Sequence, residues 1–475
     1  MREKYESLAV ADLKAVAKAR GLKGISLLKK AEVVELMLQA DEKDRQEKER
    51  QEQEKRERAK KLVESKTKTT DSGSTSEKTE TTQSSTEKPE RPEKRDEMEL
   101  DSGIVAHGIL EVMPDGYGFI RCENYLPGER DVYVAPSQIR RFGLKTGDII
   151  EGSTRIKTQS EKFAALLIVK TINGYSPEVA STRSNFEDMT PIFPNERLKL
   201  EIPGASVAMR IMDLISPVGK GQRGMIVSPP KAGKTTLLKD VARSVKRNNP
   251  DAHLIILLID ERPEEVTDIR EAIEGPNVEV IYSTFDELPE HHKRVSEMVI
   301  ERGRRLVEHG RDVVILVDSI TRLTRAYNQV VPPSGRTLSG GLDPAALHMP
   351  KRFFGAARNM REGGSLTILA TALVETGSKM DDVVYEEFKG TGNMEMMLDR
   401  KLQERRIFPA IDIPKSGTRR EDLLLAVDEL EAINIIRKAM TGLKPEESVD
   451  RILDMFSKTR NNQEFVNMVK KIKFI

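Results

Sequence analysis

The segment from Gly224 to Leu238, GMIVSPPKAGKTTLL, constrains the fold of this chain more than any other feature. A short apolar run is followed by a Pro- and Gly-containing loop, and the pattern then predicts a helix that begins at Lys234. A loop ending in Gly-Lys-Thr at a helix start is typical of phosphate binding, because backbone N–H groups and the helix N-terminus face the anion. The sequence therefore predicts a buried strand, a phosphate-holding loop and a helix in direct succession.

The end of this loop has specific expected chemistry. Lys234 would reach the β- and γ-phosphates of a nucleotide, and the Thr235 hydroxyl would ligate Mg²⁺. One position departs from the general pattern, which asks for Gly at position 228, where this chain has Ser228. The alternative interpretation is a Gly-containing connection that holds no ligand, and the strand and helix on either side argue against it.

Two apolar runs downstream end in acidic residues. Leu254–Ile259 is followed by Asp260 and Glu261, and Val313–Val317 is followed by Asp318. In parallel sheets ligands bind beyond the carboxyl ends of the strands, so we expect these acids near the phosphate loop. Asp318 would belong to the Mg²⁺ shell, and a carboxylate at Glu261 would orient and deprotonate an attacking water. The alternative for each acid alone is a cap for the next helix.

Composition and periodicity divide the chain. Residues 1–40 predict a small helical unit, and 41–100, first charged and then rich in Ser, Thr and Pro, predict a disordered linker. Residues 101–176 contain five short alternating runs, which predict a small antiparallel barrel. After a connector at 177–190, nearly continuous apolar runs alternate with helical stretches in 191–475, which predicts a parallel α/β sheet buried on both faces.

Bulk composition narrows the function classes. The 475 residues carry a formal net charge of only +1, so any nucleic-acid site must be a local basic patch. Cys122 is the single cysteine, which excludes an intramolecular disulfide and fits a reducing cytosol. The six histidines lack metal-ligand spacing, and no 18-residue apolar run or signal peptide is present. We therefore expect a soluble protein.

One barrel run, DGYGFIR at 115–121, has the pattern of a nucleic-acid platform. Because side chains alternate along a strand, Tyr117, Phe119 and Arg121 share one face. Two aromatic rings beside a base suit the stacking of unpaired nucleobases, but period alone equally allows the rings to be core residues. Acidic side chains on nearby runs could accept a hydrogen bond from cytosine N4. The neighbouring candidates are Asp131, Tyr133, Glu161 and Phe163.

The pattern alone does not choose among the candidates for two further roles, a cation at the transition state and loops that contact a polymer. Hydrolysis needs positive charge on the transition state, for which the candidates are Arg405, Arg406, Arg419 and Arg420. Two loops, at 330–344 and 375–382, combine Gly or Ser with single cations, which suits sliding contact with a threaded polymer. Ordinary surface connections are the alternative for both loops.

Long runs across residues 103–475 resemble the Rho family of bacterial transcription termination factors, and residues 1–40 resemble its small helical N-terminal unit. The runs, in the family's order, are DGYGFIR (115–121), YVAPSQIRRFGLKTGD (133–148), PPKAGKT (229–235), LLIDERPEEVTD (257–268), DSITRLTRAYN (318–328), KRFFGAARN (351–359), EEFKGTGNME (386–395) and IFPAIDIPKSGTRR (407–420).

This resemblance implies a RecA-like P-loop ATPase core with an OB- or cold-shock-like barrel. It also implies a cytoplasmic homohexamer that uses ATP and Mg²⁺ as an RNA-dependent ATPase and 5′→3′ translocase or helicase. Such a protein binds C-rich, single-stranded nascent RNA and terminates transcription, with RNA polymerase and elongation factors as partners and no membrane. The alternatives are a rotary-type or other RecA-like hexameric ATPase, and a passive RNA-binding regulator.

The resemblance also implies roles for individual residues. Glu261 matches the catalytic base, Arg419 an arginine finger that acts on a neighbouring subunit, and Arg406 a phosphate sensor. The implied nucleotide contacts are Lys231, Ala232, Gly233, Lys234, Thr235, Thr236, Arg262 and Phe408, with Phe408 stacking on adenine. The seven barrel residues Tyr117, Phe119, Arg121, Asp131, Tyr133, Glu161 and Phe163 match the primary RNA site. Thr337, Ser339, Gly340 and Lys379 match a second, central-channel site.

Overall fold

The computed structural model describes residues 30, 33, 100–158, 161–440 and 445–471. The helical unit predicted for 1–40, apart from Lys30 and Val33, lies outside the described residues, as does the linker predicted for 41–100, apart from Leu100.

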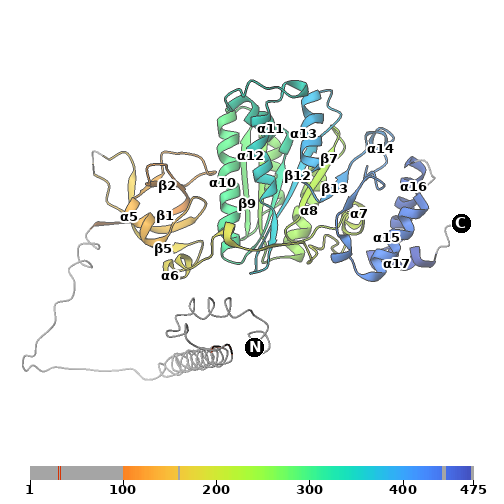
Figure 1. Cartoon of the computed structure of the whole chain (residues 1–475), viewed down its shortest axis with the longest axis horizontal. Coiled ribbons are helices and arrows are strands. Elements are labelled where there is room, and N and C mark those ends of the chain that lie inside the picture. Colours follow the sequence, from red (N-terminus) through yellow and green to blue (C-terminus); the bar gives the residue numbers. More distant parts are fainter. Residues whose placement is uncertain (1–29, 31–32, 34–99, 159–160, 441–444, 472–475) are drawn as a thin grey trace, which may run out of the picture. The chain divides into compact units, whose positions relative to one another are not determined.

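Five strands close into a barrel in the order β1-β2-β3-β5-β4 (Figure 1). Strands β3 and β5 run parallel, so the expectation of a wholly antiparallel barrel is wrong. The reason is topological: β4 pairs antiparallel with β1 and β5 antiparallel with β4, so β5 closes the barrel in the direction of β3. The barrel elements are β1 (Asp101–Val112), β2 (Gly118–Arg121), β3 (Val132–Val134), α5 (Pro136–Phe142), β4 (Ile149–Arg155) and β5 (Ala164–Ile172).

A connector leads from the barrel to a larger sheet of order β14-β13-β7-β12-β10-β8-β9, to which β11 and β6 are added beside β12. The strands from β13 to β9 along this order are parallel, and β14 pairs antiparallel with β13. The connector and strands are α6 (Pro177–Ser181), η2 (Phe186–Asp188), β6 (Pro191–Ile192), β7 (Arg223–Ser228), β8 (His253–Glu261), β9 (Val278–Thr284), β10 (Asp312–Asp318), β11 (Arg358–Met360), β12 (Ser365–Leu373), β13 (Met394–Met397) and β14 (Gly417–Thr418).

Helices cover both faces of this sheet (Figure 1). They are α7 (Val207–Ile215), α8 (Lys234–Asn248), α9 (Pro263–Ala272), α10 (Pro289–Glu308), α11 (Ile320–Val330), α12 (Pro344–Gly355), α13 (Lys379–Lys389), α14 (Arg400–Glu404), α15 (Val427–Met440), α16 (Pro445–Ser457) and α17 (Asn462–Lys471), with short turns η3 (Ser339–Gly341) and η4 (Glu421–Leu423). Among the described helices, none combines the length and apolar composition that crossing a membrane requires.

The central strands have no polar face because each side of the sheet meets a separate core. In β8, Leu254, Ile256 and Leu258 pack with α7, α8, α9 and the C-terminal helices. The alternate residues Ile255 and Leu257 pack with α10 to α13 on the other face. This double burial explains the continuous apolar runs of the sequence, and the parallel direction of the strands places their carboxyl ends along one edge.

Candidate nucleotide site and nucleic-acid interface

The phosphate loop has the predicted succession of elements. Strand β7 ends at the fully buried Ser228, and helix α8 begins at Lys234, as the sequence predicts. Lys231 and Gly233 have φ values of 66° and 91°, so the backbone turns sharply just before the helix. Position 228 is not among the residues with positive φ, and its hydroxyl donates to the carbonyl of Pro229 at 2.8 Å. A small serine therefore satisfies a position where the general pattern has glycine.

Three charged side chains meet beside this loop. The Lys234 ammonium donates to Glu261 Oε1 at 3.0 Å and also contacts Asp318 Oδ1. Asp318 additionally accepts a hydrogen bond from the Thr371 hydroxyl of β12 at 2.8 Å, and the two carboxylates are only 1% and 3% exposed. The ends of β8 and β10 and the start of α8 thus bring together the three residues that the sequence assigned to one site.

Burial and mutual charge shift the titration of these groups. Burial would lower the pKa of Lys234, but Asp318 and Glu261 outweigh it, so the net pKa is raised and the ammonium stays charged. Burial and the negative charge of Asp318 raise the pKa of Glu261, against the opposing charges of Lys234 and Arg322. A raised carboxyl pKa makes Glu261 a better proton acceptor in its ionised form.

The oxygen donors at this edge suit a magnesium ion. The Thr235 hydroxyl and the Asp318 carboxylate are hard ligands of the kind that Mg²⁺ prefers. No group of three or more acidic, His or Cys side chains with metal-binding geometry occurs among the described residues. Two protein oxygens are enough for Mg²⁺, which usually keeps waters and substrate phosphates as its other ligands.

Arg322 is a site residue that sequence reasoning missed. From the first turn of α11 it lies 3.3 Å from Glu261 Oε2 and donates to the backbone carbonyl of Asp260. Its position in the first turn of a helix that starts directly after the Asp318 strand end was a usable signal. Glu261 therefore lies between two cations, Lys234 and Arg322.

The other predicted nucleotide contacts are distributed around the loop. Lys231 and Thr236 are exposed and Ala232 is buried. The Arg262 side chain is largely exposed and pairs with Glu265 on α9 at 3.3 Å. Phe408 is 55% exposed.

Arg406 and Phe408 lie on a segment that leaves the sheet at the phosphate-loop edge. At the start of this segment, the backbone of Leu398 donates to the Val227 carbonyl at 2.8 Å, next to the end of β7. Arg406 has a φ of 62° and is exposed. Arg405, another of the four candidates, lies directly before it at the end of α14.

Arg419 lies at the opposite edge of the sheet. Its backbone N–H donates to Asn393 at 2.8 Å, and Asn393 donates to the Arg223 carbonyl at 2.9 Å, where β7 begins. Five steps of about 3.3 Å along β7 place this edge roughly 17 Å from the strand end that leads into the loop. Arg419 and Lys234 of one chain are therefore not neighbours. The remaining candidate, Arg420, pairs with Asp422 at 3.0 Å.

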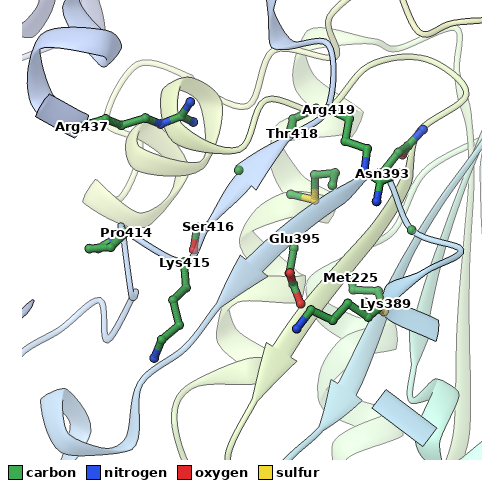
Figure 2. Close-up of a pocket in the computed structure, with 13 residues that line it drawn as sticks. Met225, Lys389, Asn393, Glu395, Pro414, Lys415, Ser416, Thr418, Arg419 and Arg437 are labelled. Carbon is green, nitrogen blue, oxygen red and sulfur yellow. The ribbon is translucent and has the colours of Figure 1, made fainter. Parts of the chain in front are cut away.

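Arg419 borders an open pocket of about 510 Å³ (Figure 2). Figure 2 shows Arg419 beside Asn393 at one end, with Lys389 and Glu395 farther along the pocket. The Arg419 side chain makes no ion pair with any residue that the structure describes, so its guanidinium is open to a partner.

The barrel aromatics form one partly exposed cluster rather than a core. The Phe119 ring centroid lies 5.1 Å from that of Phe163, 5.8 Å from that of Tyr117 and 6.0 Å from that of Tyr133. All four rings are partly exposed, whereas the barrel core is built from aliphatic side chains such as Leu110. The structure thus excludes the core alternative, and the stacking of nucleobases on these rings stays a prediction. We call these four rings the aromatic platform.

The charged residues of the predicted primary site lie close to this platform but are not free. Arg121 is only 6% exposed and pairs with Asp131 and Glu111, so its charge is balanced within the barrel, and its contact with RNA stays a prediction. Its guanidinium lies 4.9 Å from the Phe119 ring centroid and supports the platform from one side. Glu161 pairs with Arg155 and accepts from the Thr158 N–H at 3.0 Å, a bond that lowers the pKa of Glu161.

The two loops assigned to a second RNA site meet each other. Gly340, with a φ of 79°, packs so closely on the start of α13 that a Cβ there would lie 2.4 Å from the backbone nitrogen of Met380. Lys379 is the first residue of that helix. Thr337 and Ser339 are exposed beside Gly340. The sequence predicted these positions as separate loops, and the fold makes them one surface.

Comparison with known proteins finds matches for the barrel and for the larger sheet. Residues 106–178 match the family model "Rho termination factor, RNA-binding domain", and residues 208–418 match "ATP synthase alpha/beta family, nucleotide-binding domain". Transcription termination factor Rho of Pseudomonas aeruginosa is 56% identical over 373 residues, which cover 78% of this chain and 88% of that protein. The factor of the same name from Bacillus subtilis is 55% identical over 372 residues, which cover 78% and 86%.

A solved ATPase from the type III secretion system of pathogenic bacteria shares the fold. It superposes with a TM-score of 0.50 over 67% of this chain and 94% of its own, at 19% identity. At that identity the likeness concerns architecture alone.

Proposed function

The chain belongs to the Rho family of transcription termination factors, and from this premise we propose that it hydrolyses ATP in response to RNA and moves 5′→3′ along it. It is an ATP-dependent, RNA-binding terminator of transcription. We further propose that it captures C-rich, single-stranded nascent RNA and acts as a helicase. We assign RNA capture to residues 101–176 and hydrolysis to residues 191–475.

One observation carries this proposal. Lys234, Glu261 and Asp318 meet at the carboxyl edge of the sheet, in the same chain as an exposed aromatic platform. A passive RNA-binding regulator has no use for a buried carboxylate placed between two cations. A rotary-type ATPase subunit has no use for four exposed rings on a small barrel.

The geometry of the site supports a specific role for each residue in ATP hydrolysis. Backbone N–H groups of the 229–233 loop and the Lys234 ammonium would hold the ATP phosphates, and the Phe408 ring would stack on adenine. Bound at Thr235 and Asp318, Mg²⁺ would neutralise charge on the β- and γ-phosphates. Glu261 would take a proton from the water that attacks the γ-phosphorus, and the γ-phosphoryl group would leave the β-phosphate oxygen.

A second copy of the chain completes the site in this proposal. Arg419 lies at the far edge of the sheet from Lys234, with its side chain open at a pocket. An arginine that stabilises the transition state would therefore come from a neighbouring subunit, with Arg406 closer to the bound phosphates of its own chain. Repeating one such heterologous contact generates a closed ring, and we propose a homohexamer.

RNA would meet the ring at two places. The aromatic platform would stack successive bases, with cytosine preference from the carboxylates of Asp131 and Glu161. The joined surface of Thr337, Ser339, Gly340 and Lys379 would contact the strand during movement. RNA polymerase and its elongation factors are the proposed partners, with the cytoplasm as the compartment in which nascent transcripts occur.

The ATPase rate of the full chain with poly(C), with double-stranded DNA and without nucleic acid tests this function. We expect poly(C) to stimulate turnover by at least tenfold and duplex DNA to have no effect. Equal turnover in all three conditions would favour a rotary-type ATPase instead. Tight poly(C) binding without turnover would favour the passive regulator.

A further inference from the structure

Glu111 of strand β1 is shared by two guanidinium groups from different parts of the chain. It accepts from Arg121 Nε of the barrel at 2.7 Å, and Arg294 Nη2 of helix α10 lies 2.7 Å from both carboxylate oxygens. The Glu111 side chain is 16% exposed and that of Arg294 is 34% exposed, so the bridge is shielded from water mainly on its carboxylate side. An ion pair shielded from water is held more firmly than an exposed one.

On the barrel side, the bridge continues beneath the aromatic platform. Arg121 joins Glu111 to the buried Asp131 and supports the Phe119 ring at 4.9 Å. Four charged side chains form a row in which the sign of the charge alternates and the net charge is zero: Asp131, Arg121, Glu111 and Arg294. Arg294 is the member that the ATPase domain supplies. Without it, the cluster beneath the platform would carry one excess negative charge.

On the ATPase side, the same helix reaches the catalytic edge. Glu297, one turn after Arg294 on α10, accepts a hydrogen bond from the hydroxyl of the buried Tyr327 at 3.1 Å. Tyr327 belongs to α11, whose first turn carries Arg322 to within 3.3 Å of Glu261. Helix α10 therefore contacts both the barrel cluster and the helix that borders the proposed base.

The strand that presents Phe119 is anchored a second time, close by. Three residues after Arg121, the Asn124 amide pairs with both backbone groups of Tyr282, at 2.7 and 3.1 Å, on strand β9. Strand β9 pairs with β8, where Thr284 lies opposite Glu261. The segment that follows the platform strand is thus tied to β9, the strand that lies beside the end of β8.

We propose that Glu111 and Arg294 are positioning residues that couple RNA on the aromatic platform to ATP hydrolysis at Glu261. The inference rests on the proposed RNA-stimulated hydrolysis and adds the residues through which stimulation passes. A base that stacks on Phe119 and contacts Arg121 or Asp131 changes the ion pair between Arg121 and Glu111. The ion pair between Glu111 and Arg294 then changes as well. Helices α10 and α11 transmit this change to the position of Arg322. The part of this coupling that acts on nucleotide affinity is reciprocal, so the factor by which RNA changes the affinity for nucleotide is the factor by which bound nucleotide changes the affinity for RNA.

Substitution of Arg294 in the full-length chain tests the proposal. Arg294→Gln removes the charge, whereas Arg294→Lys keeps it, and a lysine can rescue because a single Arg294 nitrogen makes both contacts. Lys293→Gln, one position earlier on α10, removes the same charge from a side chain that forms no ion pair with any described residue. Three quantities are measured for each variant: basal ATP turnover, the Kd for a cytidine oligonucleotide, and turnover at saturating poly(C).

We expect Arg294→Gln to keep basal turnover and to lower the stimulation at saturating poly(C) by about fivefold or more, the lower end of typical coupling. Arg294→Lys and Lys293→Gln should keep most of the stimulation. A merely structural pair would alter the Kd or the melting temperature without changing the saturated stimulation. The proposal is overturned if Arg294→Gln is stimulated within twofold of the unsubstituted chain, or if Arg294→Lys loses as much as Arg294→Gln.

The same data separate this inference from the proposed function. If poly(C) fails to stimulate the unsubstituted chain, both the proposed function and the proposed coupling are refuted. If poly(C) stimulates the unsubstituted chain and Arg294→Gln equally, only the coupling fails. As a reciprocal check, a non-hydrolysable ATP analogue should change the Kd for the oligonucleotide in the unsubstituted chain and change it less in Arg294→Gln.

Discussion

Replacing Glu261 with Gln removes a single charge from the centre of the nucleotide site while keeping the shape of the side chain. Two cations, Lys234 and Arg322, contact the buried carboxylates Glu261 and Asp318 there, and the more exposed Asp260 lies 3.9 Å from Arg322. The substitution removes one negative charge from this group. ATP is an anion, so its affinity should stay the same or increase.

The expected loss in rate follows from the role of the carboxylate. Glutamine cannot accept the proton of the attacking water, and a positioned general base contributes about 10²- to 10⁴-fold. At about 1.36 kcal/mol per tenfold, this corresponds to roughly 2.7–5.4 kcal/mol in the activation barrier. Because burial and Asp318 raise the pKa of Glu261, turnover of the unsubstituted chain should also decline toward acid pH as that carboxylate is protonated. The substituted chain should lack this acidic limb.

The assay measures turnover at saturating poly(C) from pH 5 to 8, together with the Kd for a fluorescent ATP analogue. Glu265→Gln is the matched control, since Glu265 pairs with the exposed Arg262 outside the buried group. We expect Glu265→Gln to behave as the unsubstituted chain does. Turnover of Glu261→Gln within about threefold of the control would refute the assignment of the base, as would an unchanged acidic limb.

Four further outcomes follow from the structure. Phe119→Ala should weaken the binding of C-rich RNA by about 1–3 kcal/mol, the cost of losing one stacked base, and unchanged affinity in an anisotropy titration would disprove stacking. Arg419→Ala should abolish turnover alone, yet mixing it with Glu261→Gln chains should restore some, because mixed rings contain interfaces with both residues intact; no recovery would contradict action between subunits. Gly340→Ala should reduce poly(C)-stimulated turnover, because the new Cβ would meet the start of α13, and normal stimulation would remove this contact from the mechanism. Burial, with the charge of Arg183, lowers the pKa of His309 to about 4, so between about pH 4 and 6.5 the unfolded chain binds more protons and the free energy of unfolding falls as pH falls. Chemical denaturation at several pH values should show that the free energy of unfolding depends less steeply on pH in His309→Gln. An equally steep dependence would show that His309 is not its origin.

Each of these variants has a matched control in the chain. Phe142→Ala removes a ring from the same barrel outside the aromatic platform. Arg420→Ala removes the neighbour of Arg419, which already pairs with Asp422. Gly341→Ala strains a φ of 82° with no atom close to the new Cβ, so it isolates the effect of the clash at Gly340. His291→Gln alters an exposed histidine for which no comparable burial exists.

Local chemistry made part of this structure predictable. The start of α8 at Lys234 and the strand at Val132–Val134 follow from short patterns that the fold leaves unchanged. The meeting of Glu261 and Asp318 was also predictable, because parallel strands end along one edge of their sheet. The departure at Ser228 is compatible with the backbone of the loop, since residue 228 does not adopt a positive φ.

Pairings between distant segments were not predictable. The parallel contact of β3 with β5 depends on how β4 returns to β1, which no local period encodes. The pairing of Arg121 with Glu111 and Asp131 decides whether its charge is available, and this appears only when the barrel closes. The bridge from Glu111 to Arg294 spans 183 positions and has no pattern in the sequence.

Transcript release from a stalled transcription complex tests the proposed function most directly. Immobilised complexes carrying a C-rich upstream RNA are incubated with the chain and ATP, and the released RNA is measured in a single turnover. We predict release that requires both ATP and the C-rich segment and that is lost with Glu261→Gln. Equal release by Glu261→Gln, or with a non-hydrolysable ATP analogue, would contradict termination driven by hydrolysis at this site.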